Sequence, residues 1–293
     1  MIVARYELAD AVRSKRAAVV MVLYMAGAIV SINGFISVLQ RLEEQIARTL
    51  KINIMESAGA VTESLWKSVH FRNMIIGLVG DKEIALDLLN IPPVALMYGW
   101  LAFTFTPMLI ILTTSARIAD EIGTGSVRYT VQRCSRSAWP LGKFLGQAGL
   151  VVLALALSAI SAWSVARIRL SVMDSWATAQ AFIIFSGKAW IYSFAFIGLA
   201  TGVSQLSRSA NQATIFGFLV WFTLSMISIA ARFNAGTGIR TIWYVIDAAL
   251  PSGHRLDLWR TDPLSLICAS AFVIAMGFCY WAAGYLYFRR RDL

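Results

Sequence analysis

Charged residues near the middle of the chain gather in one polar segment, residues 117–143, which lies between two long apolar runs. The segment carries five Lys/Arg and two acids, one of them Glu121, and Gly123 and Gly125 interrupt its helical pattern. Carboxylates and guanidinium groups make charge-assisted hydrogen bonds with other proteins, and glycine lets the backbone turn between a span and a loop. The chemistry predicted here is binding of a soluble partner. The alternative is a solvated loop that only orients the protein in a membrane.

Residue patterns that would support catalysis are missing from the sequence. Gly142-Lys143 is followed by Phe144, and Ser137 stands where a phosphate-binding loop would need its first glycine. No Ser/His/Asp, Cys/His or paired-carboxylate arrangement lies in a plausible pocket. His70 and His254 have no companions at metal-ligand spacing. We therefore expect no enzyme activity, and no catalytic, cofactor-binding or metal-binding residues on this chain.

The composition indicates an integral membrane protein. The 293 residues are 58% hydrophobic and 14% charged, whereas soluble domains carry about 25% charged residues. A span needs about 20 apolar residues to cross the hydrocarbon core. The runs long enough to span are 17–39, 94–116, 144–166, 183–204, 213–231 and 264–288. The expected fold class is an all-α integral membrane protein, with a cytoplasmic N-terminal interfacial helix at 1–16 and a six-span domain at 17–293.

The distribution of Lys and Arg predicts that both termini are cytoplasmic. With the N-terminus inside, the cytoplasmic segments hold 13 Lys/Arg in 56 residues, and the external segments hold 12 in 97. Positive charge concentrates on the cytoplasmic side of membrane proteins. Most of the net charge of +10 is then cytoplasmic and faces anionic lipid or a protein partner, so no nucleic acid is needed to explain it.

Two external segments have helical patterns of their own. Residues 40–93 predict a helical external cap, which either shields the outer mouth or contacts a substrate or an external partner. Residues 232–262 place Ile239, Ile242, Trp243, Ile246 and Leu250 at helical spacing, yet the segment is too short to span. It predicts a re-entrant or interfacial helix on the external side.

Few polar residues lie inside the expected spans, and two of them are candidate contacts for the path or for lipid. Lys188 is near the start of the fourth span, and an ionisable residue there is by default a functional candidate. Snorkelling of its long stem to the external interface is the simpler interpretation. Asn33 in the first span has the capacity to hydrogen-bond to a neighbouring helix or to kink its own. Gly198 and Gly202 form a Gly-xxx-Gly pair that permits close helix approach.

Three local motifs and the overall architecture resemble the type-2 ABC transporter permease family. The N-terminal RYELADAVRSKR resembles the family's charged N-terminal helix, and EIGTGSVRYTVQR resembles its E-x-x-x-G-T-L run. Gly142-Lys143 matches the pair that opens the third span in the family, and YFRRRDL resembles its usual ending.

The resemblance implies two six-span permease subunits, as a homodimer or heterodimer, in a bacterial cytoplasmic (inner) membrane. Two separate cytoplasmic ATPase subunits, which hold the ATP and Mg²⁺, would dock on the N-terminal helix and on the coupling loop at 117–143. For residues 1–16, the alternative is a simple positive-inside anchor. The residues that would couple to the ATPase are Tyr6, Glu7, Arg13, Glu121, Gly125, Arg128, Arg133 and Arg136.

The leading function is therefore a permease subunit that forms the translocation path of an ABC exporter. The alternative of a different class is a non-transporting six-span scaffold or signalling protein, moved by an ATPase and acting on an external partner. A secondary carrier is disfavoured, because the spans lack the acidic residues expected of a proton- or sodium-driven carrier.

The topology can be tested by cysteine labelling. After replacement of the native cysteines, we expect Leu65→Cys to react with an impermeant reagent from outside and Thr130→Cys only from inside, because the charge distribution places the cap and the coupling loop on opposite sides. Labelling of both positions from the same side would contradict the six-span arrangement.

Overall fold

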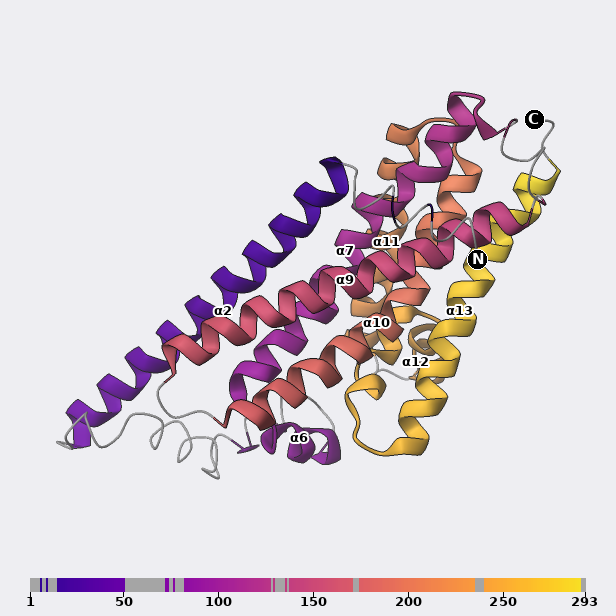
Figure 1. Ribbon diagram of the computed structural model, residues 1–293. Helices are drawn as coiled ribbons and strands as arrows, with labels where there is room; N and C mark the ends of the chain where they lie inside the picture. Colours follow the sequence, from indigo (N-terminus) through magenta and orange to yellow (C-terminus); the bar gives the residue numbers. More distant parts are fainter. Residues whose placement is uncertain are drawn as a thin grey trace. The chain divides into compact units, whose positions relative to one another are not determined.

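The computed structural model describes the chain as a series of long helices with a few shorter ones (Figure 1). The longest are α2 (Lys15–Leu50), α7 (Pro93–Gly123), α9 (Ala138–Arg169), α10 (Ser175–Leu206), α11 (Ala210–Asn234) and α13 (Pro263–Arg289). Shorter elements are α6 (Lys82–Leu89), α12 (Arg240–Ala248) and the 3-10 helices η1 (Pro251–Arg255) and η2 (Asp257–Trp259). The described residues are 6, 9, 15–50, 72–73, 76, 82–127, 129, 135, 137–170, 174–234 and 240–290.

Six helices are long and apolar enough to cross a membrane, which confirms the predicted all-α membrane fold. Each contains one of the apolar runs read from the sequence, and no strand occurs among the described residues. In lipid, a helix satisfies its own backbone hydrogen bonds, which is why it is the natural form for these runs.

The helices extend beyond the apolar runs that predicted them. For example, the first span is part of α2, a helix of 36 residues that continues to Leu50. Leu39, Leu42, Ile46 and Leu50 have the spacing of one helix face, which predicted a helix at the start of the cap. The helix that starts the expected cap is therefore continuous with the first span. The cap also contains α6, which ends shortly before Pro92-Pro93, and residues 51–71 of the cap lie outside the described residues.

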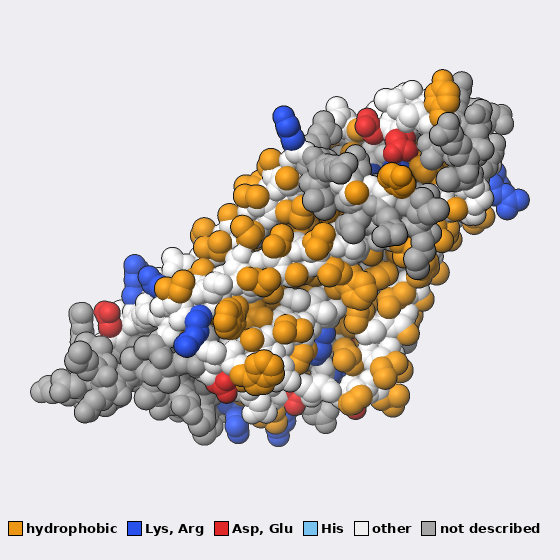
Figure 2. Space-filling model, viewed as in Figure 1, with side chains coloured by type: hydrophobic (Ala, Val, Ile, Leu, Met, Phe, Trp, Pro, Cys, Tyr) orange, Lys and Arg blue, Asp and Glu red, His pale blue; other side chains and the backbone are white. Residues whose placement is uncertain are grey.

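Much of the helix surface is apolar, as Figure 2 shows by the hydrophobic side chains on the visible face. In the most apolar stretch of α2, only 17% of the residues are buried within the chain, and the share is the same in α11. The exposed residues of α11 include Leu219, Phe222 and Met226. Such faces are stable only against lipid or another protein, as expected of a membrane subunit.

The chain divides into two compact units, which are described in turn. Unit 1 comprises residues 1–21, 103–153 and 189–293, and unit 2 comprises residues 22–102 and 154–188.

In unit 1, α10 and α13 meet backbone to backbone. A Cβ atom added at Gly198 would collide with the carbonyl of Gly277, and one added at Gly284 would lie 2.6 Å from the Cα of Gly202. Small residues let spans approach closely and pack through van der Waals contact. The Gly-xxx-Gly pair of α10 therefore has its partner within the chain, namely the glycines of α13.

Also in unit 1, the predicted helix at 232–262 exists as α12, and η1 and η2 carry the chain on to α13. This segment is fastened to three spans. Ser228 of α11 donates to Asp247 (2.6 Å), Arg255 donates to Thr104 of α7 (3.1 Å), and the His254 ring lies 4.5 Å from that of Phe272 on α13. The segment thus folds back onto these three spans.

In unit 2, α6 packs through Ile84, Ala85 and Leu88, which are all nearly fully buried. In the same unit, the hydroxyl of Tyr98 lies within 3.1 Å of the Ser158 hydroxyl and 2.9 Å of the Ser186 hydroxyl. These contacts join α7, α9 and α10 by hydrogen bonds that satisfy buried polar groups.

The glycine contact predicts a position-specific effect on stability. We expect Gly198→Ala to destabilise the protein by about 1–3 kcal/mol, because the added methyl group meets the backbone of α13, which cannot rotate away. Thermal unfolding in detergent measures this. The matched control is Gly187→Ala in the same helix, which has nothing within 4 Å of the added atom. It should be neutral or stabilising, and equal losses in both variants would refute the argument.

Candidate functional site

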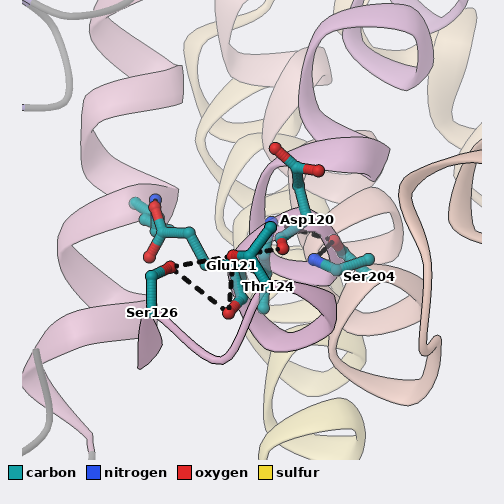
Figure 3. A network of polar contacts seen from close by, with 8 residues as sticks. Asp120, Glu121, Thr124, Ser126 and Ser204 are labelled. Carbon is teal, nitrogen blue, oxygen red and sulfur yellow. Dashed lines mark hydrogen bonds and ion pairs between the residues drawn. The ribbon is translucent and has the colours of Figure 1, made fainter. Parts of the chain in front are cut away.

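The end of α7 is built by glycine and by hydroxyl groups that cover its last carbonyls. Gly125 has a positive φ of 72°, a conformation that ends a helix and that glycine adopts without strain. The Thr124 hydroxyl donates to the carbonyl of Asp120 (2.9 Å), and the Ser126 hydroxyl donates to that of Glu121 (3.3 Å). These groups lie together in Figure 3. The coupling loop therefore leaves α7 from a defined cap.

Glu121 forms an ion pair with Lys143, which lies near the start of α9. The Lys143 Nζ atom is 2.6 Å from Glu121 Oε1. The lysine side chain is only 4% exposed, while that of Glu121 is 32% exposed. The ammonium also lies 5.5 Å from the centre of the Trp139 ring, within the range of a cation–π contact. The pair closes the loop between α7 and α9, and the carboxylate keeps a solvent-accessible side.

A hydrophobic cluster lies beneath this ion pair. Ile118, Val127, Trp139 and Phe288 are each at most 1% exposed, and the rings of Trp139 and Phe288 are 5.6 Å apart. The cluster draws on the end of α7, the loop after it, the start of α9 and the end of α13. Burial of this apolar area anchors both ends of the coupling loop.

Two further contacts fix α7 just before the loop. The Ser204 hydroxyl of α10 accepts from the backbone N–H groups of Ile118 (3.1 Å) and Ala119 (3.0 Å). Gly123 approaches the connection between α10 and α11 so closely that a Cβ would lie 2.9 Å from the Arg208 carbonyl oxygen. The segments expected at 117–143 and 205–212 on the cytoplasmic side are thus neighbours, at the same end of unit 1 as the C-terminal end of α13.

Of the residues predicted to couple to an ATPase, the structure describes Tyr6, Glu121 and Gly125. Tyr6 is helical and 75% exposed, which leaves its ring open to a partner. Glu121 and Gly125 lie four residues apart at the end of α7. Glu7, Arg13, Arg128, Arg133 and Arg136 lie outside the described residues.

Sequence reasoning did not include Lys143, Trp139, Ser204 or Phe288 in the site. The sequence did contain a hint for Lys143, because this lysine and Glu121 stand near opposite ends of the loop segment 117–143 and carry opposite charges. The contributions of Ser204 and Phe288 depend on tertiary packing, and no local pattern reveals them. The Asp120 carboxylate, next to Glu121, points away from the hydrogen-bonded groups (Figure 3).

The expectation that Lys188 snorkels to the external interface was wrong. Its side chain is buried in unit 2, 9% exposed, and α10 begins thirteen residues earlier, at Ser175. The carboxylate of Asp87 on α6 is the charged group that acts on it electrostatically. Burial of a lysine without an opposite charge is costly, so a partner from α6 replaces the solvent that snorkelling would have supplied.

Asn33, the other polar candidate, is exposed on α2. Its backbone carbonyl accepts a hydrogen bond from the Ser37 hydroxyl (2.9 Å), a common contact within a helix. The structure thus places Asn33 at the surface of the chain.

Comparison with known proteins gives one family. The model of a family described as "ABC-2 family transporter protein" matches residues 1–239, which is most of the chain and includes α7 and the coupling loop. No curated protein shows a significant match.

The Lys188 environment predicts coupled effects of two substitutions. We expect Lys188→Met and Asp87→Asn each to lower the free energy of unfolding by about 2 kcal/mol, since each leaves a charge without its opposite. The double variant should lose less than the sum, as thermal or denaturant unfolding can show. Lys82→Met, at an exposed position of α6, serves as the control and should have little effect. Strict additivity would mean that the two residues do not interact.

Proposed function

The chain belongs to the ABC-2 family of transporter proteins, and on this premise we propose that it forms the translocation path of an ABC exporter and couples to a separate ATPase. The family match and the six apolar helices make it a multi-pass membrane protein, a permease subunit of an ABC transporter. Export, ATPase coupling and the inner-membrane location with cytoplasmic termini are the steps we add.

The observation that carries the coupling proposal is the anchored end of α7. A loop that transmits motion needs a surface that the partner binds and internal contacts that fix it to the spans. Glu121 offers a partly exposed carboxylate, and Lys143 and the cluster around Trp139 hold the loop from within. Motion applied by an ATPase to this loop would pass directly to the spans that meet in the cluster.

The exposed Tyr6 supports a second contact with the same ATPase. It belongs to the N-terminal segment, whose sequence resembles the charged N-terminal helix of the family. In this proposal ATP and Mg²⁺ are bound by the ATPase subunits, and this chain contributes no catalytic residue.

A second permease subunit, identical or different, completes the path in our proposal. The support is the large apolar surface that α2 and α11 leave uncovered within the chain. Lipid covers whatever part of these faces the second subunit does not.

The ATPase-docking proposal can be tested by co-purification of the chain with a co-expressed ABC ATPase subunit from the same source. We expect Glu121→Lys to weaken docking by about 2–5 kcal/mol, because it reverses a charge at a desolvated interface. ATP hydrolysis should become independent of the permease, while membrane insertion is unchanged. The control is Asp120→Asn, which alters an exposed acid that points away from the cap and should leave docking and hydrolysis intact.

The combination of Glu121→Lys with Lys143→Glu separates two roles of the glutamate. It rebuilds the internal ion pair but presents the opposite charge to the ATPase. Continued loss of docking would show direct contact through the Glu121 charge, and recovery would show that the loop anchor is what coupling needs. Normal coupling in the Glu121→Lys variant would exclude Glu121 from the mechanism.

A further inference from the structure

The turn between α12 and α13 contains a histidine whose two ring nitrogens both face oxygen atoms. His254 Nε2 lies 2.7 Å from the carbonyl oxygen of Ala248, and Nδ1 lies 3.3 Å from Asp257 Oδ2. The imidazole is 16% exposed and the Asp257 side chain 41% exposed, so protons from water can reach the pair. This arrangement lies in unit 1, where Thr104 marks its contact with α7, about 26 Å along that helix from Glu121.

The two oxygen neighbours dictate how the ring must be protonated. A carbonyl oxygen only accepts, so Nε2 must carry a hydrogen in order to bond to Ala248. In the neutral ring, Nδ1 then has a lone pair that faces a carboxylate, and this contact is repulsive. In the imidazolium, Nδ1 carries a hydrogen as well and donates a charge-assisted hydrogen bond to Asp257. Protonation therefore changes one repulsive contact into an attractive one.

We propose that residues 248–257 form an acid-closed latch, in which protonated His254 ties the end of α12 to η2 and holds this segment against α7 and α13. The histidine bridges Ala248 at the end of α12 and Asp257 in η2. The same segment donates from Arg255 to Thr104 of α7, and Trp259 of η2 packs against Phe103 of α7 with ring centres 5.8 Å apart.

The other elements around His254 contribute an aromatic ring and further charges. From α13, the Phe272 ring lies 4.5 Å from the imidazole, and an imidazolium gains a cation–π contact there. Asp257 also pairs with Arg260, whose Nε is 3.7 Å from its Oδ1. On α12, Asp247 accepts from Ser228 of α11 (2.6 Å). Asp257 is the acid that faces the ring.

Another nearby acid, Asp262, is stabilised in its ionised form. Asp262 caps α13 and accepts from the backbone N–H (2.9 Å) and the hydroxyl (2.7 Å) of Ser265. These hydrogen bonds hold the pKa of Asp262 below its usual range. Asp262 therefore keeps its negative charge between about pH 8 and pH 5.5, and histidine is the side chain that ordinarily changes its charge in that interval.

Because protonation makes the contact between His254 and Asp257 attractive, acid favours the closed latch. The closed latch is stabilised at low pH, where the ring carries both protons, and the stabilisation is lost as the pH rises and Nδ1 is deprotonated. Acid in the compartment that this turn faces would hold the segment closed against the spans, and alkaline conditions would release it. This inference rests on the local geometry and is independent of the proposed coupling to an ATPase.

Hydrogen exchange followed by mass spectrometry tests the latch on the full chain in lipid nanodiscs. We expect backbone amides of residues 249–262 to exchange about tenfold more slowly at pH 5.5 than at pH 8, after correction for the intrinsic rate, because one charge-assisted hydrogen bond is gained. His254→Gln keeps an N–H donor for Ala248 but cannot be protonated, so it should abolish the pH effect. Unchanged or weaker protection at pH 5.5 in the native chain would overturn the proposal.

The matched control is His70→Gln, because the sequence has only two histidines, and it should retain the full pH effect. If His254→Gln does not fold, Asp257→Asn provides the second variant. It keeps the histidine, removes the carboxylate and should reduce the pH effect to about twofold or less. A pH effect that persists at full size in either latch variant would refute the role of the pair.

Nuclear magnetic resonance of ring-¹⁵N-labelled histidine gives an independent readout in the His70→Gln background, where His254 supplies the single signal. At high pH the shifts should report the neutral ring with hydrogen on Nε2, and at low pH the imidazolium. A neutral ring with hydrogen on Nδ1 would contradict the bond to Ala248 and hence the latch.

Discussion

The contact between the backbones of α10 and α13 sets the positions of the groups that form the candidate site. Because glycines occupy the crossing, the two helices approach more closely than side chains would permit. Ser204 follows Gly202 by two residues and reaches the backbone of α7. Phe288 follows Gly284 by one helical turn and reaches Trp139. A wider crossing would separate the serine or the phenylalanine from its partner, and the end of α7 would lose part of its support.

The sequence reveals those features that local pattern determines. Hydropathy located each span that the structure describes, because an apolar run of about 20 residues is long enough to cross the hydrocarbon core. The charged segment with Glu121 and Gly125 pointed to the end of α7. The glycine pair of α10 indicated a close approach. Its partner on α13 could not be read, since the identity of a neighbouring helix depends on the packing of the whole unit.

The errors and omissions have the same physical origin. Lys143 is distant from Glu121 along the chain, and their pairing depends on how α7 and α9 pack. The snorkelling expectation for Lys188 assumed that its nearest source of solvation was the membrane interface. It omitted α6, whose carboxylate supplies an opposite charge inside the protein. Patterns within one helix do not show which side chains another helix will bring to it.

The burial of Lys188 has a consequence for how the protein is made. Asp87 precedes Lys188 in the chain, so during synthesis from the N-terminus its carboxylate leaves the ribosome before α10 does. A lysine near the middle of a newly inserted helix is costly in lipid when it has no partner. Because Asp87 is synthesised first, its carboxylate is already present when α10 is inserted. The charge of Lys188 therefore does not depend on a later part of the chain for its partner.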